Sequence, residues 1–562
     1  ELHTQGQKIN GLRAQGELLA DSLTFSNLSA QDYAGAALKL SGGIGSLKAL
    51  SGIDIKVAAQ SSDLPRFAQA LKIDPAALPA NLSRASGNVT AKGSAEKLAV
   101  SAAIQALNGE VIASGDVTAP LGAWALSGLA VEIKHQNIAE ALAMFAPSAP
   151  RYASWQKPMQ VAASIVQKDQ VYQLSGIKGN LAGATVAGDL TIATGGAQQD
   201  IRGNLTFGDL VMTSGGGFSS SSGVEQVRPS GNVGGGKWSS EPIDSAWMHS
   251  MTMDLSLAAN SILYNSWNLQ KPSLKVTMKD GTLRIADLKS TLFGGSLAMD
   301  ATAVSAAQGK GALSIDAKTQ FDHVSMEKLV QGLVGVPILQ ASGDVSMSAA
   351  ITTTGASQSA LINAMGGQGT VTGKSLTLEG IDVTRFVTAL SDETKPGDTL
   401  QGLWKGATRG GSTSFDTLDG NFAIERGMVN IAKMDLDGPQ ASIATRGTVN
   451  LPAWTIATAH TMTAKTRTDV PPFTMNISGP LDNPGQTFAQ GAINDYLTRK
   501  LERKVGNALD KILTKKLGLP PAQPADVAPS GGEQGAAPAP QGSEKVTPEE
   551  ALKGVLKGIL SR

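Results

Sequence analysis

The sequence lacks cysteine and has few aromatic or charged residues. Its 562 residues include 7 Trp, 5 Tyr and 12 Phe, and charged residues make up 17%, where soluble domains carry about 25%. The absence of cysteine excludes disulfide bonds, thiolate catalysis and cysteine-ligated zinc or iron–sulfur sites. It permits an oxidising compartment without requiring one. With so few large side chains, the composition favours thin sheets over thick globular cores.

An excess of one charge and a long hydrophobic run are also missing. Lys plus Arg and Asp plus Glu both number 47, so nothing in the balance attracts a polyanion and we expect no nucleic-acid partner. Apolar stretches such as Ala141–Pro147 are far shorter than the ~20 residues of a membrane-spanning helix. The sequence starts at Glu1 without Met or a signal peptide, so we expect a targeting segment or N-terminal anchor outside this chain.

Catalytic and metal-binding motifs are not found either. The five histidines stand singly, without the paired spacing of a zinc site. Gly367-Gln368-Gly369 lacks the third glycine of a dinucleotide fingerprint and precedes an expected strand. The segment Gly411-Ser412-Thr413-Ser414 lacks the second glycine of a nucleophile elbow. We therefore predict a protein that is not an enzyme and uses no metal or cofactor.

What the sequence does contain is alternation of apolar and polar residues with period two, which predicts strands with one apolar face. Ser250–Ala258 shows it clearly, and Lys279-Asp280-Gly281 predicts a hairpin turn between two further strands. Strands are also expected at Ser296–Val304, Val345–Ile351 and Phe473–Ile477. The apolar positions along this part of the chain are Met251, Met253, Leu255, Leu257, Leu274, Val276, Met278, Leu283, Ile285, Leu297, Met299, Val345 and Met347.

Helical periodicity is confined to four short segments, each directly after an expected strand. They are Asp63–Lys72, Asn137–Phe145, His323–Leu333 and Asp382–Leu390. Such helices are too short to cross over a sheet between parallel strands, so the sheet should be antiparallel. Leu64 and Ile138 lie 74 residues apart, and Asp116 and Asp189 lie 73 apart. The agreement predicts an internal repeat.

Two segments without periodicity divide the chain. Met212–Lys237 is rich in Gly and Ser and reads as a flexible loop, and Pro520–Val546 is expected to be disordered. We therefore divide the chain into β-groove repeats (1–211), the Gly/Ser-rich loop (212–237), a second β region (238–486), a basic amphipathic helix (487–519), a disordered linker (520–546) and a short amphipathic helix (547–562).

The basic helix has two interpretations. It caps the last strand with a solvated charged face, or it lies on an anionic membrane surface, which takes an apolar stripe flanked by cations. The short last helix has the same two interpretations and a third, as a docking peptide. The residues of the basic helix that would contact a membrane are Ile493, Leu497, Arg499, Lys500, Leu501, Arg503, Lys504, Val505, Leu509, Lys511 and Ile512.

A series of motifs in the second half resembles the AsmA family of Gram-negative envelope proteins. The series starts with Lys237-Trp238-Ser239-Ser240-Glu241-Pro242-Ile243-Asp244, followed by Lys279-Asp280-Gly281-Thr282-Leu283 and Leu292-Phe293-Gly294-Gly295-Ser296-Leu297. Matching segments continue in order through Leu361–Asp382, Thr413–Asn430 and Ile477–Pro484. The resemblance covers roughly 237–486, with weaker similarity before it.

The resemblance implies an elongated, twisted sheet curled into an open groove with an apolar inside, which moves phospholipid between inner and outer membranes. It implies a periplasmic protein anchored to the inner membrane by an N-terminal helix not in this chain, and an outer-membrane protein as a possible partner. The residues agree, because the few short helices leave an apolar face of Met, Leu, Val and Ala that suits flexible acyl tails. A covering second sheet would make a sandwich instead.

An alternative of another class is a structural or adhesive β-solenoid of the cell envelope. It would also be Gly-rich, free of cysteine and repetitive, but its coils repeat every 20–30 residues or so. The helices that follow strands favour the groove.

Overall fold

The computed structural model describes residues 2–4, 7–75, 82–120, 125–145, 155–194, 196, 198–212, 237–306, 311–335, 340–390, 400–407, 410–489, 495–496, 498–500 and 502–503. Residues 1–497 form one compact unit and 498–562 a second. Almost all of the second unit lies outside the described residues.

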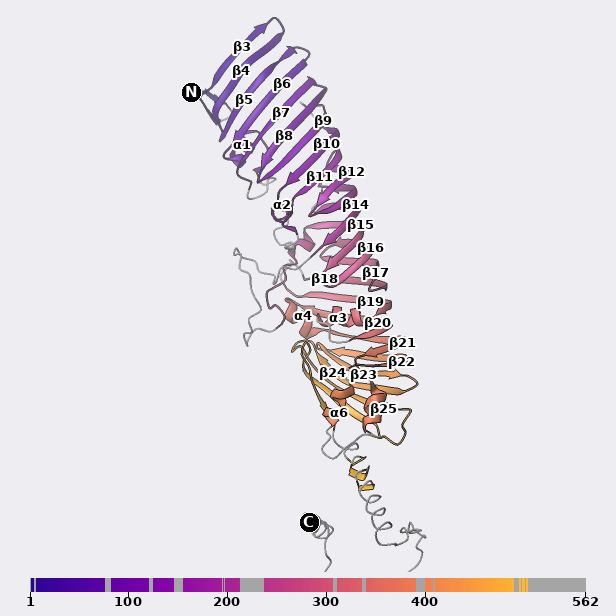
Figure 1. Ribbon diagram of the computed structural model, residues 1–562. Helices are drawn as coiled ribbons and strands as arrows, with labels where there is room; N and C mark the ends of the chain where they lie inside the picture. The colour runs from indigo at the N-terminus through magenta and orange to yellow at the C-terminus, as the bar shows by residue number, and fades with distance from the viewer. Residues whose placement is uncertain are drawn as a thin grey trace, which may run out of the picture. The chain divides into compact units, whose positions relative to one another are not determined.

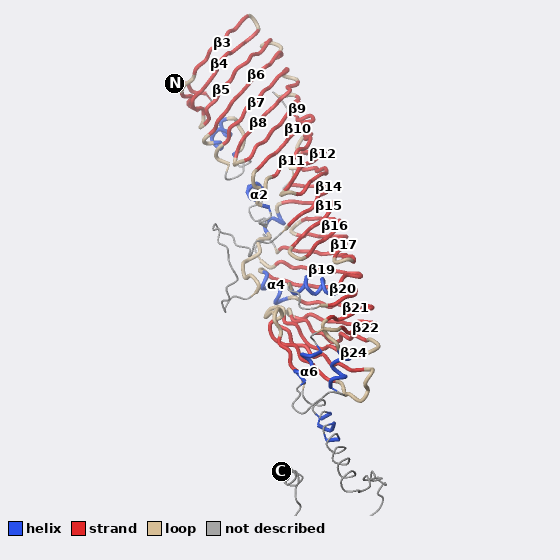
Figure 2. The backbone as a smooth tube through the Cα atoms, in the orientation of Figure 1, coloured by secondary structure: helices blue, strands red, loops and turns tan. Residues whose placement is uncertain are grey.

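The described part of the first unit is built around a single 27-stranded sheet, coloured red in Figure 2. In the N-terminal half the strands are β1 (Leu2–Thr4), β2 (Gln7–Asn10), β3 (Arg13–Leu19), β4 (Ser22–Tyr33), β5 (Ala36–Ser46), β6 (Ser51–Ser61), β7 (Ala85–Ser94), β8 (Lys97–Ala106), β9 (Gly109–Thr118), β10 (Ala125–His135), β11 (Met159–Lys168), β12 (Val171–Leu181), β13 (Ala184–Ala193) and β14 (Gln199–Val211).

The sheet continues with strands from the second half of the chain. They are β15 (Met251–Tyr264), β16 (Trp267–Lys279), β17 (Thr282–Leu292), β18 (Gly295–Ser305), β19 (Leu313–Ser325), β20 (Ala341–Gly355), β21 (Gly366–Glu379), β22 (Ser412–Glu425), β23 (Met428–Asp437), β24 (Ala441–Asn450), β25 (Thr455–Ala464), β26 (Phe473–Pro480) and β27 (Gly485–Phe488). The mainly β fold predicted from the period-two pattern is confirmed.

From β3 onward each strand pairs with the next one along the chain, as the labels in Figure 1 show. Every such pair is antiparallel except β14 and β15, which run parallel with Gln199 opposite Met251. The predicted antiparallel sheet is confirmed at every other pair from β3 onward, and this pair is the exception. Because the two strands are parallel neighbours, the chain must pass from the end of β14 back to the opposite end of the strands before it enters β15. A local sequence pattern does not reveal such a connection.

The short helices follow strand ends. They are α1 (Leu64–Ala70), α2 (Ile138–Phe145), η3 (Ala246–His249), α3 (Met326–Val334), α4 (Gln358–Ala364), α5 (Val383–Thr388) and α6 (Leu400–Ala407). Asp63, Ser325 and Asp382 cap α1, α3 and α5 by accepting a backbone N–H of the first turn. The four helices expected from sequence are confirmed with bounds that differ by a few residues, whereas η3, α4 and α6 were not foreseen.

The strand directions place α1, α2, α3, α5 and α6 on one long edge of the sheet, which we call the helix rim. It is the edge at which β6, β10, β19 and β21 end. Antiparallel strands end alternately at the two long edges, and the parallel β14–β15 pair shifts this alternation by one strand. Up to β14 the even-numbered strands therefore end at the helix rim, and from β15 onward the odd-numbered strands do. The opposite edge, called the strap rim, carries η3 and α4. Figure 2 shows the helices as short pieces beside the sheet.

The two faces of the sheet differ in chemistry. Cross-strand ion pairs such as Lys92–Asp54 (3.0 Å), Lys275–Asp254 (3.2 Å) and Lys97–Asp116 (2.8 Å) all lie on one face, the polar face. Their side chains are a third or more exposed, so each contributes no more than about 1 kcal/mol. They make this face hydrophilic, in contrast to the opposite face, which we call the apolar face.

Bulges and glycines curve the strands. At Asp287 the register between β17 and β18 shifts, φ is +51°, and the backbone N–H donates to Asp300 on the next strand at 3.2 Å. At Gly203 φ is +150°, and a Cβ would overlap the carbonyl oxygen of Asp189 on β13. Bulges and glycine kinks of this kind let a twisted sheet curl.

The apolar face is closed over part of its length by two clusters. Near the helix rim, Leu329 of α3 packs with Phe321, Val324 and Leu292. Toward the C-terminal end, the α5 and α6 side chains pack with β21–β26. Several of the buried or partly buried residues there are aromatic: Phe386, Trp404, Phe415, Phe473 and Phe488. The expectation of an apolar face with hardly any aromatics and too few helices to cover it was wrong here.

Candidate functional site: the apolar face of the sheet

One row of facing residues crosses the apolar face from β3 to β26 without a polar side chain. In this apolar row, each residue lies opposite the next on the neighbouring strand, with a bulge at β9–β10. Its members are Gly16, Phe25, Gly42, Ile55, Ala91, Val100, Gly115, Leu129, Ile165, Leu174, Leu190, Gly203, Leu255, Val276, Ile285, Ala301, Ala317, Ile351, Gly367, Ile424, Val429, Val449, Ile456 and Gly479.

Most of this row is neither buried nor fully exposed. Leu255 and Ile424 are buried, while residues such as Ile55, Val276 and Ile351 are half-buried. At ~4.8 Å per strand, a row of 24 strands follows a path of roughly 110 Å along the sheet. A half-buried apolar surface of this length gains stability when another apolar group covers it.

Along the strands of the second half of the chain, the row runs between two covered margins. On the helix rim side, α3 buries Val345 and Leu376, and α5 buries residues of β21 and β22. On the strap rim side, η3 contributes Met248, which is 3% exposed, and Met278 beside it is 1% exposed. The open part of the apolar face is therefore a lane between the rims, and the apolar row is its floor.

The predicted groove residues all lie on this face. Cross-strand pairs join Met253 to Met278, Leu255 to Val276 and Leu257 to Leu274. The pairs continue through Leu283, Ile285, Leu297 and Met299 to Met347 and Val345. Four of the thirteen are buried, and the other nine are half-buried. The buried four are Leu255, Met278, Leu297 and Val345. These four belong to the hydrophobic core, and the nine half-buried positions form the accessible surface.

The predicted membrane-surface helix lies almost entirely outside the described residues. Of its candidates only Arg499, Lys500 and Arg503 fall in the described part. Just before them, Tyr496 packs against the C-terminal cluster and its hydroxyl donates to Asp469 at 3.3 Å. The start of this segment is thus attached to the end of the sheet. Its membrane contact stays a prediction.

A polar group on the apolar face was missed by sequence reasoning. His460 on β25 faces Thr445 and has Thr458 two residues away on its own strand; each hydroxyl lies 2.9 Å from one ring nitrogen. Burial lowers the pKa of His460 below its ordinary value of 6.5. The alternation of Thr458, His460 and Met462 looks no different from other strands, so only the cross-strand partner distinguishes this histidine.

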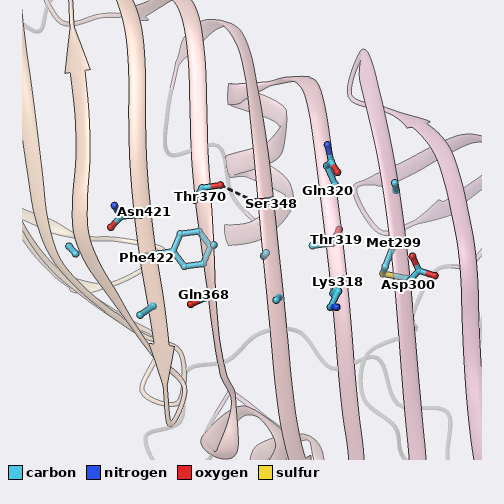
Figure 3. A pocket seen from close by; sticks show the side chains of 16 residues that line it. Met299, Asp300, Lys318, Thr319, Gln320, Ser348, Gln368, Thr370, Asn421 and Phe422 are labelled. Atoms are coloured by element: carbon cyan, nitrogen blue, oxygen red, sulfur yellow. Dashed lines mark hydrogen bonds between the residues drawn. The ribbon is translucent and has the colours of Figure 1, made fainter.

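Shallow hollows also lie along the sheet. One of them, about 720 Å³, crosses β18 to β23 (Figure 3) and is lined by residues such as Lys318, Gln320 and Thr370. The hydroxyls of Thr370 and Ser348 are hydrogen-bonded at 2.9 Å. The lining of this hollow includes residues of both faces, such as Asp300 of the polar face and Met299 of the apolar face, but no member of the apolar row. This hollow is therefore separate from the apolar row.

No group of three or more His, Asp or Glu side chains among the described residues is arranged to hold a metal ion. None of the helices in the described part is both long and apolar enough to cross a membrane.

Comparison with known proteins gives one match. A family model described as "AsmA family" matches residues 9–434, so the similarity extends through the N-terminal strands, well beyond the segment suggested by the motifs. No curated protein and no solved structure matches.

Proposed function

The chain belongs to the AsmA family, whose members are envelope proteins implicated in outer-membrane and lipid transport, and from this we propose that it carries phospholipid along the apolar face of its sheet. The observation that supports the proposal is the apolar row, which presents only apolar side chains and glycines across 24 strands. The polar headgroup would stay in water at the open side of the lane.

The energetics favour acyl chains as the occupant. Exposing a chain of about 16 carbons to water costs roughly 13 kcal/mol at ~0.8 kcal/mol per CH₂. A continuous half-buried apolar surface removes most of this cost at every point of the path. The floor is made of Val, Ile, Leu, Ala and Gly with a single Phe, Phe25, and Met residues lie in adjoining rows. These side chains suit a flexible tail, because no polar group on the row would fix a rigid ligand in one orientation.

We further propose that the protein works in the periplasm, where it would contact the inner and outer membrane surfaces while lipid diffuses along the lane. An outer-membrane protein at the far end would be a fitting partner. Passive transfer needs no catalytic residue, and the protein's lack of enzymatic activity remains our prediction.

A charge placed in the lane tests the proposal. Val276→Asp puts a carboxylate on a half-buried row position, where it faces a desolvation penalty of several kcal/mol. We expect it to reduce phospholipid transfer between vesicles at least tenfold. Ser256→Asp adds the same charge to the polar face and should leave transfer unchanged. Equal transfer by the wild type and a folded Val276→Asp variant would contradict the proposal.

The β-solenoid alternative does not fit the pairing of the described strands. A solenoid stacks each strand on the equivalent strand one coil further along. Here the strands from β3 onward pair with their immediate neighbours in sequence.

A further inference from the structure

The segment Lys237–Ser250, which opens with the Trp-Ser-x-x-Pro-Ile-Asp motif, makes no strand of its own. It runs along the strap rim in the direction opposite to the order of the strands, from the β24–β25 turn back to the start of β15. On the way it contacts four separate places on the rim. We call this segment the strap.

The first anchor is a tryptophan at the far end. The indole Nε1–H of Trp238 donates to the carbonyl oxygen of Leu451 at 2.7 Å, across 213 residues of sequence. Its ring meets Trp454 edge to face with centroids 5.5 Å apart, and the Lys237 ammonium lies 3.7 Å from the Trp454 ring centroid. Such aromatic and cation–π contacts are directional and hold the strap end at the β24–β25 turn.

The second anchor joins the strap to α4 and the end of β20. Ser239 accepts the backbone N–H of Ser359 at 2.9 Å, and its own N–H donates to Gln358 Oε1 at 3.1 Å. Pro242 forms an isolated bridge with Ser357, and the Ile243 N–H donates to the carbonyl of Ala356 at 2.8 Å.

The last two anchors lie close to β15. Ser245 and Ser305 share a hydroxyl hydrogen bond of 2.7 Å, and both are at most 5% exposed. Gly281 donates its N–H to the carbonyl of Met248 at 3.2 Å, and the Gln198 side chain donates to the carbonyl of His249 at 2.8 Å. The strap therefore ties the ends of β14, β16–β17, β18, β20 and β24.

The strap has almost no slack. From β15 to β24 there are nine strand spacings, which cover ~43 Å in a flat sheet at ~4.8 Å each. The backbone from Trp238 to Ser250, with the tight turn of η3, spans at most ~35 Å. The Trp238 side chain covers the remainder. Hydrogen bonds fix the distance between neighbouring strands, but small changes at each pair add up to a large change in curvature over many strands. A segment with almost no slack, attached along one edge, limits this change.

From these contacts we infer that the strap is a conformational restraint that fixes the curvature of β15–β25, with Trp238 as its latch. Release of the latch lets the strap rim relax and widens the lane over this part of the apolar face. The inference concerns curvature and goes beyond the proposed lipid transfer.

The absence of cysteine allows a direct test on the full chain. Nitroxide labels at Ser256→Cys on β15 and Ala457→Cys on β25 lie on exposed positions of the polar face. Pulsed electron–electron double resonance measures the distribution of distances between the two labels in the lipid-free protein. We expect Trp238→Ala to lengthen the mean distance by several ångströms and broaden the distribution. Trp247→Ala is the matched control, because Trp247 belongs to the same segment but is 39% exposed.

A second variant covers the case in which Trp238→Ala does not fold. Three glycines inserted between the exposed residues Ser240 and Glu241 lengthen the strap without removing any anchor. The distance should again increase and broaden. An unchanged distribution in the insertion variant would overturn the inference, as would an equal response of the Trp238 and Trp247 variants. Because no lipid is present, either result leaves the lipid proposal to its own test.

Discussion

Met253 on β15 lies directly opposite Met278 on β16, yet the two methionines have different surroundings. Met278 is 1% exposed beside η3, whereas Met253 is half-buried on the open part of the apolar face. The same residue type in the same cross-strand pair thus serves as core at one position and as accessible surface at the other.

This difference predicts unequal costs of truncation. Met278→Ala should lower the free energy of unfolding by about 2–5 kcal/mol, because it leaves a cavity in a closed core. Met253→Ala should cost about 1 kcal/mol, because water already reaches that position. Urea unfolding followed by tryptophan fluorescence measures both. Similar values would show that the two sites are equally closed.

Curvature depends on glycine at Gly203. Gly203→Val places a side chain against the Asp189 carbonyl with φ at +150°, so the β13–β14 pairing should open. We expect amides of these two strands to lose hydrogen-exchange protection by at least tenfold. Asn204→Val, one residue away on the polar face, should retain protection. Full protection in the Gly203 variant would show that the strand does not need this bend.

Acid should destabilise the sheet near His460. Burial lowers its folded-state pKa below the ordinary value of 6.5, so the unfolded chain takes up a proton more readily. The stability that comes from keeping His460 neutral is fully present above pH 6.5. It is lost as the pH falls from there through the lower folded-state pKa. His460→Gln removes the ionisation, and its melting temperature should fall less than that of the wild type between pH 7 and pH 5. Parallel pH profiles would contradict this assignment.

The basic segment is tested as a peptide. Within 488–518 seven Lys or Arg outweigh three acidic residues, so a synthetic peptide of this segment should become helical on anionic vesicles and dissociate as salt is raised. Circular dichroism with and without 0.5 M salt measures this. A peptide that stays unstructured on anionic vesicles would assign the segment to capping the sheet.

Local chemistry made much of the fold predictable from sequence. The Asp280-Gly281 turn forms with φ of +49° and +75°, as its residue types require. The alternation in 250–258 correctly placed Leu255 and Leu257 on the apolar face. Such features depend on neighbours in the chain, which a single sequence displays.

Long-range contacts were not predictable in this way. The Trp238–Leu451 hydrogen bond joins residues 213 positions apart, and the parallel pairing of β14 with β15 depends on where an intervening segment returns. Aromatic residues such as Phe386 and Phe473 are distant in sequence but meet with ring centroids 4.8 Å apart. These contacts decide which part of the apolar face is covered. The period-two sequence pattern is the same in the covered and the open parts.

We expect acyl chains to occupy the apolar row over its whole length. Photo-crosslinking amino acids at Ile55, Val276 and Val449 sample its two ends and its middle, and Lys56 and Ala457 sample the polar face. After irradiation in cells, mass spectrometry should find phospholipid adducts at all three row positions and none at the two controls. Adducts confined to one row position, or equal labelling of both faces, would contradict a continuous lipid path.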